Sequence, residues 1–337
     1  MRADHAALSL IKRRKEDMSY KISFLITARN ESQSMLTTTI DGLLETTTRH
    51  PREIVVIDDG SDVPITCMSP EVLVIRNQDS IGVSSSRRYA ASVASGDVLV
   101  WLDAHMTFAP DWLDHMLKHV DSGALLCSAF WDYEQSTCHC WGADFLWCSE
   151  RNYWEGRYPG FHLCHRTHFP GPGAVDVPMI IGACYMILRN SYQQLGGCSP
   201  LFRVWGVDEQ DISARAWMAG FGVKCVTGAK VGHLWRPTFP YPVHFEHLEF
   251  NQLAMMRTIF EKHTVQALEQ YFKPLPKVVK KWLKQTNLST FRKVVQSPRR
   301  MSDEEFFRQF APEVEVLVSS HKQPWNRCKD WINQCFS

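Results

Sequence analysis

Residues 97–105, DVLVWLDAH, are a short apolar run that ends in an Asp and a His. The length of the run and its β-branched residues predict a buried strand rather than a helix. Because alternate residues of a strand point to the same face, Asp103 and His105 could contact one ligand. The alternative is a strand end with a capping Asp and a surface His, and the surrounding sequence has to separate the two interpretations.

Strand and helix patterns alternate in the chain that precedes this strand. Apolar runs predict strands in residues 21–28, 52–61 and 72–77, and amphipathic segments predict helices in residues 31–47 and 82–96. Such alternation indicates parallel strands in a doubly wound sheet, whose ligands bind beyond the carboxyl ends of the strands. Three of the strands end in TARNE, DDGSD and DAH, so we expect their polar side chains along one edge of the sheet.

The second half of the chain is less regular at first. Residues 125–175 are rich in Trp, Tyr, His and Cys without clear periodicity, and we expect long ordered loops there, with room for antiparallel pieces. Later patterns predict a strand and a short helix in 179–197, a helix in 206–221, a strand in 223–236 and a helix in 250–263. The whole pattern predicts the α/β class, with a mostly parallel doubly wound sheet, helices on both faces and a helical C-terminal extension.

The composition excludes some classes of protein. Lys plus Arg (37) nearly equals Asp plus Glu (36), and the net charge of +1 argues against a surface built for nucleic acid. No apolar run reaches the roughly 18 residues of a transmembrane helix, and the N-terminal run is too short for a signal peptide. Eleven cysteines in apolar surroundings then predict free thiols and a cytoplasmic protein.

A cluster of cysteines and histidines lies in residues 138–168. The segments TCHCWGADFLWC and FHLCHRTHF supply enough side chains for a four-ligand zinc site. They contain neither a CxxC pair nor the usual paired spacing, so buried thiols and loop histidines are the stronger interpretation. A zinc site in this cluster stays open as the alternative.

Seven motifs occur in an order that resembles a known enzyme family. They are TARNES (27–32), EIVVIDDGSD (53–62), GVSSSRRYAA (82–91), WLDAH (101–105), GACYMILRNSYQQLGG (182–197), WGVDEQDISARAW (205–217) and VGHLWRPTFPY (231–241). Together they resemble the catalytic domain of the polypeptide N-acetylgalactosaminyltransferases and the related inverting GT-A group of hyaluronan and chondroitin synthases. The resemblance implies a GT-A catalytic domain over 21–245, an N-terminal extension over 1–20 and a basic helical extension over 246–337. We expect neither the lectin-like module nor the membrane anchor of that family.

The resemblance implies a divalent metal and a UDP-sugar donor. A divalent cation, most simply Mn²⁺, would neutralise the two phosphates of the donor and stabilise the leaving diphosphate. In the family an Asp-x-His pair and a distant His hold this metal, and these positions match Asp103, His105 and His233. Taken alone, His233 would be a core or loop histidine, and the matching motif around it favours a metal ligand.

The other donor contacts follow from the same resemblance. It places ten residues at the donor: Thr27, Glu31, Asp58, Asp59, Gly82, Arg87, Asp103, Trp205, Arg236 and Tyr241. Asp58 and Asp59 differ by one residue of register, so either could bind the uracil base, and DDGSD also has the composition of a turn. Arg236 and Tyr241 would hold the diphosphate from a mobile loop. Phe239 stands in this loop where the family commonly has His.

Residues 205–209, WGVDE, differ from the family's WGGEN. Glu209 replaces the Asn of the retaining peptide transferases, whereas the resembling inverting enzymes have a carboxylate base at this position. An inverting transfer needs such a base to take the acceptor's proton, so Glu209 is the candidate, with Asp208 and Asp211 beside it. Asp211 could instead pair with Arg215 one turn later. Inversion and retention both stay open.

The acceptor is less defined than the donor. The resemblance implies a peptide or protein side chain, whereas the inverting relatives suggest a glycan or lipid-linked acceptor. Residues 273–300 carry nine Lys or Arg and no acid, which is typical of a solvated helix face. The same segment could bind an acidic acceptor or make peripheral contact with an anionic membrane, with Val278, Val279, Trp282 and Leu283 as its apolar face.

Two other functions fit parts of the sequence. A nucleotidyltransferase would use the same kind of sheet, but no Gly-rich basic phosphate loop follows the first strand. A transferase-like fold could also serve as an inactive module that binds a sugar or a peptide. The intact set of metal-ligand residues argues against that second function.

Overall fold

The computed structural model describes residues 20–66, 69–152, 155–236 and 238–320, and its N-terminal half alternates parallel strands with helices. Strands β1 (Ile22–Ala28), β2 (Arg52–Asp58), β3 (Val72–Arg76) and β4 (Val98–Leu102) lie in the order β4-β1-β2-β3, with each neighbouring pair parallel. Helix α2 (Gln33–Thr46) connects β1 to β2, and α3 (Val83–Val93) connects β3 to β4. The alternation expected from the sequence is confirmed.

The other half of the sheet is mixed. Strand β11 (Cys184–Leu188) runs antiparallel between β4 and β6 (Leu125–Trp131), and β12 (Val223–His233) is parallel to β6. The full order is β10-β12-β6-β11-β4-β1-β2-β3, where β10 is Val175–Asp176. Two short strands, β5 (Met106–Phe108) and β7 (Cys138–Cys140), pair with β12 and β6. Because β12, β6, β4, β1, β2 and β3 point the same way, the sheet is mostly parallel, as predicted.

Alternate residues of the central strands face opposite sides of the sheet. On β1, Phe24 and Ile26 belong to the core that includes α2 and α4 (Trp112–Leu117), whereas Leu25 belongs to the core on the other face. Helices α3, α5 (Arg189–Gln194) and α6 (Asp208–Met218) contribute to that second core. Each Å² of apolar surface removed from water contributes roughly 25 cal/mol to stability. The two cores therefore hold helices on both faces of the sheet, as predicted.

Residues 125–175 contain more strand than the sequence indicated. Strand β6 is central and buried, and β8 (Ala143–Cys148) and β9 (Gly160–His165) form a separate antiparallel hairpin. The expectation of long loops is therefore wrong for β6, whereas the hairpin β8–β9 is an antiparallel piece of the kind that the sequence left open. The hairpin is stabilised by distant contacts, such as the Phe145 ring 5.3 Å from the Phe306 ring, and not by a local pattern.

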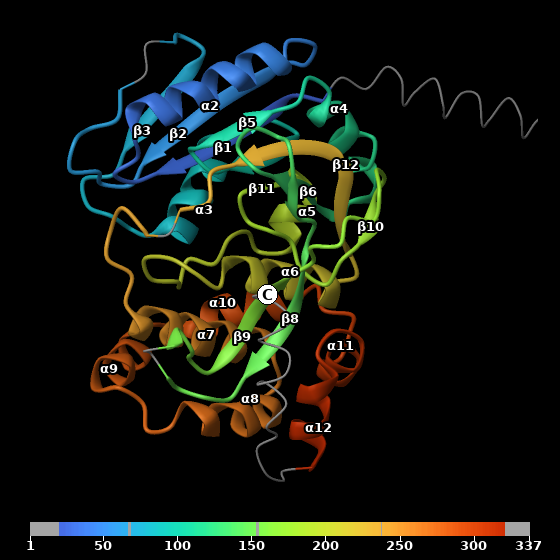
Figure 1. Ribbon diagram of the computed structural model, residues 1–337. Helices are drawn as coiled ribbons and strands as arrows, with labels where there is room; N and C mark the ends of the chain where they lie inside the picture. The colour runs from blue at the N-terminus through green and yellow to red at the C-terminus, as the bar shows by residue number, and fades with distance from the viewer. Residues whose placement is uncertain (1–19, 67–68, 153–154, 237, 321–337) are drawn as a thin grey trace, which may run out of the picture.

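The C-terminal region is helical and has its own core. After β12 the chain forms α7 (Phe245–Ile259), α8 (Lys262–Glu269), α9 (Lys277–Gln285), α10 (Leu288–Gln296), α11 (Asp303–Phe310) and α12 (Pro312–Ser320). Figure 1 shows these helices gathered around the hairpin β8–β9, at the end of the molecule opposite to α2. The rings of Phe161 and Phe307 stack with their centroids 6.1 Å apart and join the hairpin to the helices. The predicted N-terminal extension, residues 1–20, lies almost entirely outside the described residues.

Helix α9 buries the apolar face that the sequence offered to a membrane. Val279 is fully buried, and Val278, Trp282 and Leu283 pack against the C-terminal core. These side chains are therefore not available for insertion into a bilayer. Across the described parts of the chain, no helix is long and apolar enough to cross a membrane.

Most described cysteines are free thiols. The free ones include Cys127, Cys138, Cys140, Cys184, Cys198 and Cys225, and all of these except Cys138 are buried. Cys164 is disulfide-bonded. The expectation of free thiols throughout the chain is therefore wrong for Cys164.

Candidate functional site

A cavity of about 560 Å³ lies between the carboxyl ends of β1 and β4 and the hairpin β8–β9. Its position agrees with the rule that α/β sheets bind ligands beyond the carboxyl ends of their strands. The predicted site residues that line it are Thr27, Glu31, Arg87, Asp103, His105, Trp205, Glu209, His233, Arg236 and Tyr241. Those that lie outside the lining are Asp58, Asp59, Gly82, Asp208 and Asp211.

Three side chains in this cavity form a candidate metal-binding group. One ligand atom from each of Asp103, His105 and His233 lies within 4.8 Å of the others. Both ring nitrogens of His233 are buried without a hydrogen-bond partner among the described residues, although Nε2 lies 3.4 Å from Asp103 Oδ2. Buried polar atoms without partners are costly, and a bound cation would satisfy them. One carboxylate and two imidazoles therefore fit a divalent metal.

The pairing of β5 with β12 brings the distant histidine to the Asp-x-His pair. Met106 follows His105 directly and lies opposite His233 in the antiparallel register. Beyond this pair, the backbone nitrogen of Leu234 donates to the carbonyl oxygen of His105 at 3.2 Å. Residues far apart in the sequence are thus held together by sheet hydrogen bonds and not by a free loop.

A hydrogen-bonding histidine and a positively charged arginine keep Asp103 ionised. Burial alone would raise the pKa of Asp103, but His233 and Arg87 hold that pKa well below its usual range. Arg87 is itself buried, and it donates to Asp103 Oδ1 at 3.3 Å and to the carbonyl oxygen of Gly182 at 3.0 Å. An ionised carboxylate is the form that a metal ion binds.

Glu31 connects His105 to the loop that follows β12. Its Oε2 lies 3.0 Å from His105 Nδ1, and its Oε1 contacts a guanidinium nitrogen of Arg236. Burial would raise the pKa of Glu31, but hydrogen bonds from these two partners lower it. A carboxylate that accepts from Nδ1 leaves Nε2 with a free lone pair, which is the tautomer that coordinates a metal. Glu31 therefore orients a candidate ligand.

Glu209 is the acid of α6 that lines the cavity. It lies beside Gly182, where an added Cβ atom would come within 1.9 Å of Glu209 Oε1, so glycine leaves the room that this carboxylate needs. Burial raises the pKa of Glu209, against the nearby positive charge of Arg87. A carboxylate with a raised pKa at the edge of a cavity is suited to accept a proton.

The other two acids of α6 are buried outside the cavity lining. Asp211 pairs with Arg215, whose Nε lies 3.0 Å from Oδ2, and this is the structural alternative that the sequence offered. Asp208 has a buried Oδ1 without a hydrogen-bond partner among the described residues. Burial raises the pKa of Asp208; Arg87 opposes the shift and Glu209 adds to it. Neither Asp208 nor Asp211 is placed to touch a ligand in the cavity.

The acids at the end of β2 hold a turn. Asp58 accepts hydrogen bonds from the backbone nitrogens of Ser61 and Ile65 at 2.9 and 3.2 Å. Asp59 accepts from four groups, including the backbone nitrogen of Gly82 at 3.0 Å. These carboxylate oxygens are already occupied, so the turn interpretation of DDGSD accounts for them better than a donor contact does.

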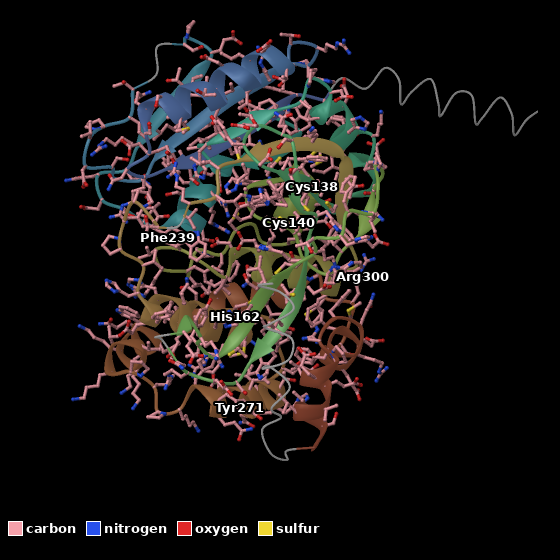
Figure 2. The ribbon with its side chains drawn as sticks, viewed as in Figure 1. Cys138, Cys140, His162, Phe239, Tyr271 and Arg300 are labelled. Atoms are coloured by element: carbon pink, nitrogen blue, oxygen red, sulfur yellow. The ribbon has the colours of Figure 1, made fainter. Side chains whose placement is uncertain are left out.

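The loop between β12 and α7 borders the cavity and is held from two sides. Asn30, after β1, donates from Nδ2 to the carbonyl oxygen of Pro240 at 3.2 Å. Phe239 packs on Trp205 with ring centroids 4.6 Å apart. Figure 2 shows Phe239 on this loop, between the sheet and the C-terminal helices. These two contacts hold the loop in place, and Tyr241 of the same loop lines the cavity.

Hairpin β8–β9 and the chain beside it supply cavity residues that the sequence did not reveal. Tyr158, His162 and His165 line the cavity there, and Figure 2 labels His162. Burial lowers the pKa values of His162 and His165, so both rings are mainly neutral at pH 7. The ring of Trp235 lies 4.7 Å from the His233 ring. His162 and His165 belong to the cluster considered for zinc. Among the described residues, that cluster contains no group of three metal ligands.

Comparison with known proteins gives two family matches. Glycosyl transferase family 2 matches residues 23–196, which are more than half of the 337 residues. The N-terminal domain of galactosyltransferase matches residues 173–247. Together the two ranges contain the candidate metal group and Glu209.

The relatives found by sequence include polypeptide N-acetylgalactosaminyltransferases. Human polypeptide N-acetylgalactosaminyltransferase 14 is 31% identical over 233 aligned residues, and the match covers 65% of this chain and 41% of that protein. Polypeptide N-acetylgalactosaminyltransferase 5 of Caenorhabditis elegans is 28% identical over 247 aligned residues, and the match covers 66% of this chain and 38% of that protein. The chain thus spans about two fifths of the length of the curated relatives that it matches.

A solved structure has the same fold. The structure of GalNAc-T7 with UDP, GalNAc and Mn²⁺ superposes with a TM-score of 0.68 at 20% identity, and the match covers 91% of this chain and 59% of that chain. The GT-A fold class expected from the seven motifs is therefore confirmed.

Proposed function

The chain belongs to glycosyl transferase family 2, and from that membership we propose that it transfers a sugar from a UDP-sugar to a hydroxyl group of a peptide or protein. The observation that carries the proposal is the convergence of the candidate metal group and Glu209 on one cavity. The name of the human relative supports a polypeptide acceptor, and the UDP and Mn²⁺ in the GalNAc-T7 structure support this donor and this metal.

Residues on the sheet side of the cavity would bind the donor. Asp103, His105 and His233 would hold a divalent metal, which neutralises the diphosphate when it is bound. Arg236 can bind phosphate oxygens through its planar guanidinium group. Burial raises the pKa of Tyr241 to about 12, so its hydroxyl remains a hydrogen-bond donor at neutral pH.

Glu209 would act as the base for the acceptor. Its carboxylate takes the proton of the acceptor hydroxyl as the hydroxyl oxygen forms a bond to the anomeric carbon of the sugar. The bond from that carbon to the diphosphate oxygen breaks, and its electron pair leaves with UDP. A base that directs attack from the side opposite to the leaving group gives inversion, so we propose inversion, with retention as the alternative.

The acceptor would enter on the hairpin side. Donor candidates occupy the sheet side and the loop after β12, which leaves the side formed by Tyr158, His162 and His165 for the acceptor. Neutral imidazoles and a phenol can hydrogen-bond a hydroxyl or an amide without requiring a charge on the acceptor. This division separates donor binding from acceptor binding, so each can be tested alone.

Release of UDP tests the proposal. With Mn²⁺ and a panel of UDP-sugars, the protein should release UDP slowly by hydrolysis, and faster when peptides with Ser or Thr are added. Asp103→Asn and His233→Ala should abolish the release, whereas His263→Ala, whose ring is 63% exposed, should leave it unchanged. A wild-type protein that neither binds UDP nor releases it from any UDP-sugar would overturn the proposal.

A glycan or lipid-linked acceptor is the second candidate, and the carboxylate at Glu209 favours it because the resembling inverting enzymes act on such acceptors. Addition of sugar and lipid acceptors to the same panel separates the two candidates. An inactive binding module would bind UDP or a sugar without turnover under all of these conditions.

A further inference from the structure

Helix α9 carries four exposed lysines along one side. Lys277, Lys280, Lys281 and Lys284 recur at spacings of three and four residues, so they form one row, which we call the α9 lysine stripe. None of the four forms an ion pair among the described residues. Figure 1 shows α9 at the outer edge of the helical region. All four lysines are exposed to solvent.

Two of the other five cations of this segment, Arg292 and Arg299, are used within the protein. Arg292 donates to two backbone carbonyl oxygens at 2.6 Å, and Arg299 pairs with Asp303 at 2.6 Å. The sequence has no acid between Glu269 and Asp303, so no neighbour in sequence neutralises the stripe. Like charges three and four residues apart on a helix repel each other. The stripe therefore destabilises its own helix, and a negatively charged partner would remove this repulsion.

The opposite face of α9 packs on the segment that forms the cavity wall. The ring centroid of Trp282 lies 4.4 Å from the guanidinium carbon of Arg203. Arg203 lies two residues before Trp205, which lines the cavity, and Asn251 donates to the backbone carbonyl oxygens of both. The helix that carries the stripe is thus attached directly to the wall of the cavity.

Arg203 adds a positive charge between the stripe and the cavity. Its Nε is buried without a hydrogen-bond partner, and it forms no ion pair among the residues that the structure describes. His247 stacks on the same Trp282 ring at 5.3 Å, and its Nδ1 is likewise buried without a partner there. A partly buried guanidinium group normally has an acidic or hydrogen-bonding partner. The positive charge of Arg203, which lies beside α9, is therefore not neutralised by an acid among the described residues.

We propose that the peptide acceptor is acidic, and that the α9 lysine stripe binds its acidic residues while the modified Ser or Thr lies in the cavity. This inference rests on the proposed transfer to a peptide. The stripe is about 10 Å long, because a helix rises about 1.5 Å per residue, and an extended peptide covers that length with about three residues. A short block of Asp or Glu is the matching chemistry. An anionic membrane fits less well, because the apolar side chains of α9 pack into the protein core.

Peptides with a single Thr and a movable block of three residues test the inference. The block is Glu, Gln or Lys, placed at several distances from the Thr, and transfer is measured at low and high salt. At the best spacing we expect kcat/KM for the Glu peptide to exceed that for the Gln peptide on the order of tenfold, as three exposed ion pairs would give. High salt should reduce this preference, because the charges are exposed to solvent.

Charge reversal makes the test specific. Lys280→Glu together with Lys281→Glu should remove the preference for the Glu block and create one for the Lys block, while use of the Gln peptide stays within about twofold. Lys118→Glu together with Lys262→Glu is the matched control, since both lysines are exposed outside the stripe, and it should behave as the wild type does.

Binding of the same peptides, measured by fluorescence anisotropy with UDP and Mn²⁺, separates this inference from the proposed function. Equal binding and equal use of the Glu and Gln peptides would overturn the inference and leave peptide transfer intact. The Glu peptide could bind, and lose its binding in the double charge reversal, while no peptide is modified. That result would support binding by the stripe and overturn peptide transfer. The protein could bind phosphatidylserine vesicles through the stripe and show no preference between the peptides. The partner of the stripe would then be a membrane, and the inference would be overturned.

Discussion

Glu209 is the residue whose substitution distinguishes chemistry from donor binding. Glu209→Gln should lower kcat for transfer by about 10²–10⁴-fold, because an amide cannot take the acceptor's proton. The affinity for UDP should change little, since the candidate donor contacts belong to other residues. Transfer assays and UDP titration calorimetry measure the two effects. The exposed Glu304→Gln is the control, and loss of UDP binding in Glu209→Gln would contradict the role of this carboxylate.

The pH profile should carry the signature of the same residue. A base acts only in its ionised form, so kcat/KM should rise with pH through a pKa above the ordinary value for Glu. Glu209→Gln should lose this limb together with most of its rate. A wild-type profile whose acidic limb lies at or below the ordinary pKa of Glu would show that another group accepts the proton.

Asp208 should reduce the stability of the folded protein. Its pKa is raised in the folded state, so ionisation of this buried carboxyl costs stability. The folded protein keeps its full stability below the unfolded pKa of Asp208 and loses stability as pH rises through the folded pKa. Asp208→Asn should therefore melt at a higher temperature than the wild type at pH 8, with a difference that shrinks toward pH 4. Thermal unfolding across this pH range is the measurement. A difference that stays constant with pH would contradict the ionisation argument.

Helix α7 supports the cavity wall through one buried amide. Asn251 accepts from the backbone nitrogen of Arg203 at 2.8 Å, and it donates to the carbonyl oxygens of Arg203, Trp205 and Gly206. Asn251→Ala leaves these backbone groups without partners, so we expect a loss of about 2–4 kcal/mol in the free energy of unfolding. The KM for the donor should rise as well, because the Trp205 wall loses its support.

Asn287→Ala is the matched control for this element. Asn287 is the exposed N-cap of α10, and its removal should cost about 1 kcal/mol without changing the donor KM. Denaturant unfolding and donor kinetics measure both variants. An unchanged donor KM in Asn251→Ala would contradict the link between α7 and the wall.

Elements with local signals were predictable from the sequence, and the hairpin was not. Strand β4 is an apolar run with turn residues on either side, and α6 has an acidic first turn, so both are visible locally. Hairpin β8–β9 depends on rings such as Phe306 and Phe307, which follow it by more than a hundred residues. No local pattern contains that contact, because tertiary packing decides it.

The candidate site shows the same division between motif and context. Asp103, His105 and His233 were predicted because a motif fixes their roles together, and the structure brings them to one cavity. Asp58 and Asp59 were placed at the donor by the same motifs, but local hydrogen bonds occupy their oxygens. Residue type and position indicate that an acid is near a site. The hydrogen-bond partners of the acid decide whether its oxygens are available to bind a ligand.

At the scale of the molecule, the cavity joins two layers with different roles. The sheet and the loop after β12 carry the donor candidates, and the hairpin carries His162 and His165 on the side that we propose for the acceptor. The C-terminal helices hold the hairpin through their shared core and present the α9 lysine stripe. We therefore expect donor binding to depend on the sheet side, and acceptor choice to depend on the helical side.

Titration calorimetry of UDP, with and without Mn²⁺, is the decisive measurement for the proposed donor site. We expect one UDP site that requires the metal, that is lost in Asp103→Asn and His233→Ala, and that is retained in Glu209→Gln and His263→Ala. UDP binding that is equally strong without metal, or that survives both Asp103→Asn and His233→Ala, would contradict this expectation.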